Sequence, residues 1–172
     1  MNELNKPVVG VIMGSDSDLK VMGKAAETLE EFGVAYEVRI ISAHRTPGVM
    51  ADYAINAANR GLKTIIAGAG GSAHLPGMTA SHTPLPVIAV PLKKPEHDHE
   101  ALWSNIKMPP GVALAVMPEN GAYNAALLAI EILALTDSEL AAKYTSFKHQ
   151  QHAEVAAKDE SVSADWRKHL AG

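Results

Sequence analysis

The alternation of short apolar runs with longer helical patterns is the strongest constraint on how this chain folds. An irregular segment, which leads into a helix near Ala101, interrupts the alternation once. Strands that alternate with helices form a parallel sheet with helices on both faces. We therefore expect an α/β fold, a three-layer sandwich of the flavodoxin-like or Rossmann-like type. The patterns predict strands at 8–13, 35–41, 64–68, 86–91 and 112–117, and helices at 18–32, 47–60, 73–82 and 121–135.

The C-terminal third has a different character. The predicted helix at 121–135 is apolar on nearly every side, so we expect it to be buried in the domain or against another subunit. After Asp137 the pattern predicts an amphipathic helix to about His152. We expect one catalytic domain at 1–155, including this helical extension, and a polar, partly helical tail at 156–172.

Composition narrows the functional classes. A chain of 172 residues that is 47% hydrophobic can bury the core of one domain. The net charge of −4 argues against broad nucleic-acid binding. The absence of cysteine excludes disulfides and thiolate chemistry. With no basic, apolar leader and no apolar run of about 18 residues, we expect a cytoplasmic protein that does not bind membranes.

The segment Ser42-Ala-His-Arg-Thr-Pro47 lies where a predicted strand ends and a helix begins. Open α/β folds place their ligands at such strand ends. Thr46 suits the N-cap and Pro47 the first helical turn, so His44 and Arg45 should lie just outside a helix N-terminus, where free N–H groups attract anions. We expect a phosphate-binding group and a proton-transfer group to meet here.

Two further segments follow the same logic. The glycine-rich run from Ala67 to Met78 follows an apolar strand, and its glycines let backbone amides approach a ligand closely. The first predicted strand runs into Gly14-Ser-Asp-Ser-Asp18. Three strand ends should therefore converge on one crevice.

These motifs together resemble one family. Met13-Gly-Ser15 with Asp18, the run from Ser42 to Pro47 and the run from Ala67 to Gly77 are similar to the bacterial class I N5-carboxyaminoimidazole ribonucleotide mutases of purine biosynthesis. The resemblance implies an isomerase that moves a carboxylate from an exocyclic nitrogen to a ring carbon of a ribonucleotide. It also implies a homo-octamer whose active sites are completed by neighbouring subunits, with no cofactor and no metal.

The resemblance assigns roles to single residues. His44 is the expected catalytic acid and base. Ser15 corresponds to a phosphate contact, Asp18 to a contact with the ribose hydroxyls, and the loop at 70–75 to the surroundings of the reacting carboxylate. The full set of expected substrate-binding residues is Gly14, Ser15, Asp18, Ser42, Arg45, Ala69, Gly70, Gly71, Ser72, His74 and Leu75.

Simpler explanations exist for several of these residues. A lone histidine such as His44 usually only hydrogen-bonds its own loop, and Arg45 could serve a surface ion pair. Ser15 and Asp18 are ordinary helix caps, and Asp16 needs no role beyond complementing a helix dipole. The pattern around His74 also fits the start of a helix, which would explain this residue without a ligand.

The run Glu96-His-Asp-His-Glu100 contains metal-ligand residue types, but adjacent and i+2 positions do not face one another on a helix. We expect a solvated loop rather than a metal site. Loops 93–100 and 117–123 depart from the family's usual pattern, and 117–123 is shorter. These departures leave room for a carboxylase that takes CO2 from solution, and the fold alone is compatible with a non-catalytic nucleotide-binding module.

Overall fold

The computed structural model describes residues 6–93 and 99–169, and the chain divides into two compact units, Met1–Leu133 and Ala134–Gly172. In the described part of the first unit, parallel strands form one sheet in the order β2-β1-β3-β4-β5. This is the doubly wound order of flavodoxin-like folds, and it confirms the predicted fold class. The strands are β1 (Val9–Met13), β2 (Tyr36–Ile40), β3 (Thr64–Gly70), β4 (Val87–Leu92) and β5 (Ala115–Val116).

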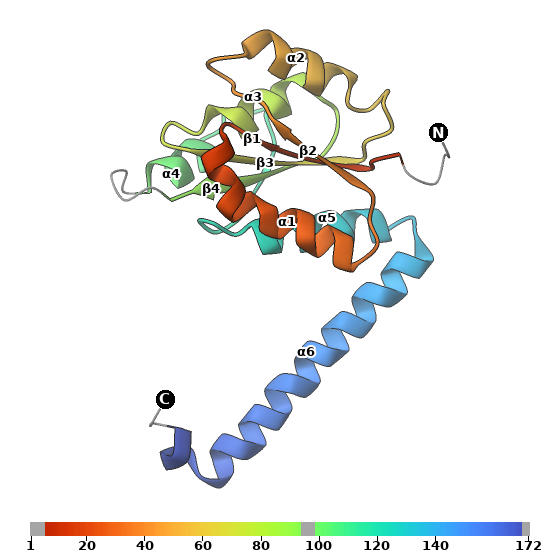
Figure 1. Ribbon diagram of the computed structural model, residues 1–172, viewed down its shortest axis with the longest axis vertical. Coiled ribbons are helices and arrows are strands. Elements are labelled where there is room, and N and C mark those ends of the chain that lie inside the picture. Colours follow the sequence, from red (N-terminus) through yellow and green to blue (C-terminus); the bar gives the residue numbers. More distant parts are fainter. Residues whose placement is uncertain (1–5, 94–98, 170–172) are drawn as a thin grey trace. The chain divides into compact units, whose positions relative to one another are not determined.

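Helices connect the strands and cover both faces of the sheet. Figure 1 shows α2 and α3 on one face and α1 and α5 on the other. Ala101 of α4 belongs to the same buried cluster as Met50 of α2 and Leu75 of α3, so α4 covers the α2 side. The helices of this unit are η2 (Asp16–Asp18), α1 (Leu19–Glu31), α2 (Pro47–Asn56), α3 (His74–His82), α4 (Glu100–Ile106) and α5 (Ala122–Ala134).

The central strand β3 divides the core by the two-residue period of a strand. Ile65, Ala67 and Ala69 point into the cluster beneath α2 and α3. Gly68 faces the opposite side, where the sulfur of Met22 on α1 packs directly over it. Because β3 is buried on both faces, its sequence is an apolar run rather than an alternating one.

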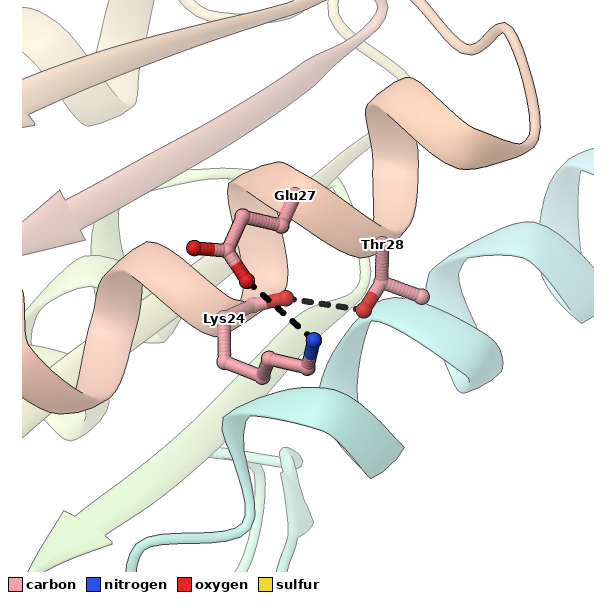
Figure 2. A network of polar contacts seen from close by, with 3 residues as sticks. All are labelled: Lys24, Glu27 and Thr28. Atoms are coloured by element: carbon pink, nitrogen blue, oxygen red, sulfur yellow. Dashed lines mark hydrogen bonds and ion pairs between the residues drawn. The ribbon is translucent and has the colours of Figure 1, made fainter.

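Helix α1 buries one polar side chain on its inward face and satisfies it locally. The Thr28 hydroxyl donates to the Lys24 carbonyl oxygen at 2.8 Å, and the Lys24 ammonium pairs with Glu27 at 3.1 Å on the exposed side (Figure 2). A buried hydroxyl without a partner would be destabilising, so this bond explains how Thr28 shares a face with Met22 and Leu29.

The predicted elements agree with the structure in type and order, but three boundaries were wrong. Helix α2 ends at Asn56 rather than at residue 60. Its end is tightened by hydrogen bonds to the third residue back, of the 3₁₀ type, such as the one from the Ala57 amide to the Ala54 carbonyl. Strand β5 begins only at Ala115, because the turn at Gly111 (φ +94°) is closed by the Val112 amide, which donates to the Pro109 carbonyl at 3.1 Å instead of to a neighbouring strand.

The third difference lies in the second unit. Helix α6 (Ser138–Ala164) continues well beyond His152, and η3 (Trp166–His169) follows it. Residues 153–160 are rich in Ala, Glu and Lys, which favour helix, and Gln150 donates to Glu154 one turn ahead at 3.0 Å. The expected boundary at residue 155 therefore falls inside a continuous helix.

Across residues 6–93 and 99–169, none of the helices combines the length and the apolar character that crossing a bilayer requires. The expected cytoplasmic location stays a prediction.

Candidate active site

The carboxyl ends of β1, β2 and β3 enclose a cavity of about 270 Å³. It lies at the point where the strand order reverses, between β1 and β3, which is where open α/β sheets bind ligands. Each of the three loops that the sequence singled out contributes to its wall. The cavity is lined by Gly14, Ser15, Asp18, Ser42, Ala43, His44, Arg45, Ala69, Gly70, Ala73, His74 and Leu75.

The loop after β1 is fixed by a reciprocal cap. The Asp18 carboxylate accepts from the Ser15 amide at 3.0 Å, and the Ser15 hydroxyl oxygen accepts from the Ser17 amide at 3.4 Å. The capping explanation is therefore correct for both residues. Both also line the cavity, and Asp18 is 8% exposed. A carboxylate has more acceptor positions than this one bond uses, so Asp18 can still accept from a ligand hydroxyl.

Asp16 lies at the outer rim of the same loop. The Ser15 hydroxyl donates to its carboxylate at 2.9 Å and holds the pKa of Asp16 below its usual range, and the Ser17 amide and the charge of Arg45 act in the same direction. Asp16 borders a shallow hollow of about 440 Å³ that extends outward over Arg45 and Thr46. Arg45 lines both this outer hollow and the inner cavity.

The loop after β2 is folded on Ser42 and Thr46. The Ser42 amide donates to the Thr46 hydroxyl and that hydroxyl donates to the Ser42 carbonyl, each at 3.0 Å. Thr46 is the N-cap of α2 and Pro47 follows it, as predicted, but the Thr46 side chain does not cap the helix. It ties the loop closed instead, which presents His44 and Arg45 on one tight turn.

Arg45 reaches across to the loop after β1. Its Nη2 donates to the Gly14 carbonyl at 2.6 Å, and its Nε donates to the Ser42 hydroxyl at 3.3 Å. These bonds hold the plane of the guanidinium while leaving further N–H donors for an anion. The contact between Arg45 and Gly14 joins two of the three loops of the site.

The loop after β3 depends on left-handed backbone at two positions. Gly71 has φ +60° and Ala73 has φ +44°, and the Ala73 amide donates to the Gly70 carbonyl at 3.2 Å. A positive φ is unusual for alanine, so this turn must be held by its surroundings. The turn brings His74, the first residue of α3, to the cavity wall.

His44 and His74 meet in the wall of the cavity. The Nε2 of His44 lies 2.7 Å from the Nδ1 of His74, so one ring donates and the other accepts. The rings are nearly perpendicular, at 89°, and both side chains are solvent-exposed. Both rings and the guanidinium of Arg45 line the same cavity.

The structure brings most of the predicted residues together. His44 and nine of the eleven expected binding residues line the cavity; Gly71 and Ser72 do not. Ser72 lines an adjacent hollow of about 310 Å³ beside α4, which His74 also borders. Sequence reasoning missed Ala43 and Ala73, which line the cavity although no chemistry of their side chains marked them.

The run Glu96-His-Asp-His-Glu100 lies partly outside the described residues, at 96–98. Within the described residues, His99 pairs with Glu119 at 2.8 Å, and Glu100 begins α4. No cluster of three potential metal ligands occurs in the described ranges. The pairing of His99 with Glu119 joins the two loops that depart from the family's pattern.

A second contact joins these divergent loops. The Lys93 amide donates to the Asn120 side-chain oxygen at 3.0 Å, and the Asn120 amide donates to the Pro91 carbonyl at 2.9 Å. Asn120 takes a left-handed backbone (φ +59°) to do so. The change in sequence at 93 and the change at 120 are therefore parts of one structural feature.

Comparison with known proteins identifies the family of this chain. The family model for AIR carboxylase matches residues 8–154. The chain belongs to this family. The N5-carboxyaminoimidazole ribonucleotide mutase of Thermotoga maritima is 54% identical over 88% of this chain and 90% of its own length. That of Pyrococcus abyssi is 47% identical, with 100% of both chains covered. The resemblance to the mutases is thus confirmed.

Two further comparisons concern a carboxylase relative and a solved structure. The phosphoribosylaminoimidazole carboxylase of Saccharomyces cerevisiae is 53% identical over 91% of this chain, but the chain spans only 28% of that protein. The crystal structure of Treponema denticola PurE has a TM-score of 0.82 and 30% identity, covering 91% of this chain and 98% of that one. The AIR carboxylase family therefore shares both the sequence and the fold of this chain.

Proposed function

We propose that this protein is a mutase of de novo purine biosynthesis that converts N5-carboxyaminoimidazole ribonucleotide into 4-carboxy-5-aminoimidazole ribonucleotide. The observation that carries the proposal is the His44–His74 pair in a cavity walled by three strand ends. Relatives that are about as long as this chain carry the mutase name. The chemistry needs one group that first gives and then takes a proton, which a histidine does near neutral pH.

The nucleotide is oriented by the polar residues of the first two loops. Arg45 and Ser15 hold the phosphate at the outer hollow, where the guanidinium is fixed by Gly14 and Ser42. Asp18 accepts from the ribose hydroxyls. This arrangement points the aminoimidazole ring inward toward the histidine pair, because both histidines line the inner cavity and neither lines the outer hollow.

The reaction then balances without an external reagent. His44 gives a proton to the exocyclic nitrogen as the N–C bond of the carbamate breaks, which releases CO2 and leaves aminoimidazole ribonucleotide. The ring carbon attacks the CO2 and forms the new C–C bond. The neutral His44 takes the proton from that ring carbon. The proton that His44 gives during decarboxylation therefore returns to it during recarboxylation.

The loop of residues 70–75 binds the reacting carboxylate in this proposal. Gly70, Ala73, His74 and Leu75 of this loop line the cavity, and in this proposal they surround the carboxylate and hold the released CO2 near the ring carbon. Proximity of the two reactants contributes as much as proton transfer. His74 binds the carboxylate and orients His44 through their hydrogen bond.

The test is to follow the label in substrate that carries carbon-13 in its carbamate. The enzyme is mixed with this substrate and excess unlabelled bicarbonate, and the product is examined by NMR. Label retained on the ring carbon is the expected result. Product with unlabelled carboxylate would contradict the mutase, and nucleotide binding without any product would indicate a binding module.

A carboxylase that uses free CO2 is the second candidate. Relatives of 52–53% identity from two yeasts bear the name phosphoribosylaminoimidazole carboxylase, though the chain spans 28% of each. The described parts of the two divergent loops follow β4 and β5 and lie at the same carboxyl edge of the sheet as the cavity. The labelling experiment separates this reaction from the mutase, because only the carboxylase incorporates solvent carbon.

The protein also acts as a homo-octamer in this proposal, with a ribonucleotide as its small-molecule partner and no cofactor. Large apolar side chains on the open edge strand support a subunit contact: Ile40 is 57% exposed and Val38 lies two residues before it. Light scattering on the purified protein measures the assembly. A monomer at micromolar concentration would contradict it.

A further inference from the structure

The glycine-rich loop has a second contact, on the side that faces away from the cavity. The Ser104 hydroxyl of α4 donates to the Ser72 carbonyl at 2.5 Å. Ser72 stands between the two left-handed residues, Gly71 and Ala73. The bond therefore holds the peptide unit between Ser72 and Ala73, inside the left-handed part of the turn, and neither Ser72 nor Ser104 lines the substrate cavity.

The direction of this bond is informative. A serine inside a helix commonly donates to the carbonyl four residues earlier in its own helix. Thr79 and Thr145 do so here, to Leu75 and Ala141. Ser104 instead reaches out of α4 to a loop 32 residues away in sequence. The hollow of about 310 Å³ around Ser72, Ser104 and His74 otherwise leaves this side of the loop open.

Helix α4 is a fixed base for such a contact. Ala101 is buried in the main core cluster, and Asn105 is buried with its side-chain amide donating to the Ala101 carbonyl at 2.6 Å. At its N-terminal end, His99 pairs with Glu119 at the start of the β5–α5 connection. A hydroxyl that projects from an anchored helix restrains the loop more effectively than one on another loop.

We propose that Ser104 is a positioning residue for the reaction, which keeps the 70–75 loop closed over the carboxylate and so retains the released CO2. This inference rests on the proposed mutase function. Without the bond, the Ala73 turn relaxes, the His74 ring moves away from His44 and the CO2 escapes before the ring carbon attacks it. The phosphate and ribose contacts come from other loops and are unaffected.

The test compares Ser104→Ala with Ser104→Thr, which keeps the hydroxyl and places its extra methyl group in the open hollow. Ser81→Ala is the matched control, because it removes another serine-to-carbonyl bond, on the surface of α3 at 2.8 Å from the Met78 oxygen. Each variant is assayed for kcat, for binding of aminoimidazole ribonucleotide, for melting temperature and for retention of the carbon-13 label in excess unlabelled bicarbonate.

Ser104→Ala should lower kcat about tenfold and lose label to bicarbonate, while nucleotide binding changes less than about twofold. Ser104→Thr and Ser81→Ala should behave like the native protein. Full label retention by Ser104→Ala would overturn the proposal, even with a lower melting temperature, because a merely structural bond does not change the fate of CO2. Failure of Ser104→Thr to restore kcat would also overturn it.

The native enzyme measured in parallel tests the proposed function separately. If it incorporates solvent carbon, the mutase assignment fails, and the Ser104 proposal is decided by kcat and by rescue with threonine. If it retains the label, both measurements apply to Ser104.

Discussion

The Nε2 of His44 and the Nδ1 of His74 are 2.7 Å apart, in rings that are nearly perpendicular. At this distance one of the two facing nitrogens donates a hydrogen bond and the other accepts it. After His44 has given a proton to the substrate, its ring nitrogen can accept a proton from His74 or from the substrate. The geometry thus suits a residue that acts as acid and then as base.

The first prediction concerns His44. Replacement by Asn removes the titrating ring but keeps a side chain of similar size, so kcat should fall by at least about 100-fold. Nucleotide binding should change little, because Arg45 and Asp18 are held by their own bonds to Gly14 and Ser15 and do not depend on the His44 ring. Steady-state kinetics and calorimetry with aminoimidazole ribonucleotide measure the two effects.

The matched control is His82→Asn, at the last residue of α3, where the ring contacts the Met78 carbonyl away from the cavity. It should keep near-native kcat. A near-native rate in His44→Asn would remove His44 from the chemistry.

The second prediction concerns Arg45→Lys. A lysine ammonium cannot bond the Gly14 carbonyl and the Ser42 hydroxyl while also meeting a phosphate in two places. The loss of about one charge-assisted hydrogen bond should raise KM about tenfold, with a much smaller effect on kcat. Arg39→Lys, on the exposed edge strand β2, is the control. An unchanged KM for Arg45→Lys would exclude Arg45 from phosphate binding.

The sequence was sufficient to predict the sheet, because buried parallel strands leave apolar runs and helices leave a 3.6-residue period. It also predicted which three loops line the cavity, since parallel strands bring the residues that follow them to one edge. The prediction that His44 and Arg45 meet in this cavity followed from their place after β2. These features depend on neighbours close in sequence or on a regular topology.

What the sequence did not predict depends on contacts between distant segments. The bond from Ser104 to Ser72 and the pairing of His99 with Glu119 leave no periodic signal. Thr46 was correctly placed at the start of α2, yet its side chain bonds Ser42 rather than the helix, because the preceding turn offers a nearer partner. The length of β5 depended on a left-handed glycine turn.

The third prediction concerns packing between α1 and β3. A Cβ at Gly68 would lie 2.3 Å from the Met22 sulfur and within 3 Å of two more Met22 atoms, so Gly68→Ala should reduce the free energy of unfolding by about 1–3 kcal/mol. Gly23→Ala is the opposite control, since nothing lies within 4 Å and the helix interior favours alanine by about 0.5–1 kcal/mol. Urea denaturation measures both; equal stability of the two variants would mean that Met22 moves aside freely.

The last prediction uses the buried Tyr53 of α2, which packs over Gly10 beside the Glu37–Arg60 ion pair. Burial raises the pKa of the Tyr53 hydroxyl above its ordinary value of 10.0, and the charge of Glu37 adds to the effect. The folded protein therefore keeps this proton after the unfolded chain has lost it. The free energy of unfolding of the native protein, minus that of Tyr53→Phe, should be constant below about pH 9. This difference should decline as the pH rises toward about 11. Denaturation series on both proteins test this, and parallel curves throughout would show that Tyr53 ionises as readily in the fold as in the unfolded chain.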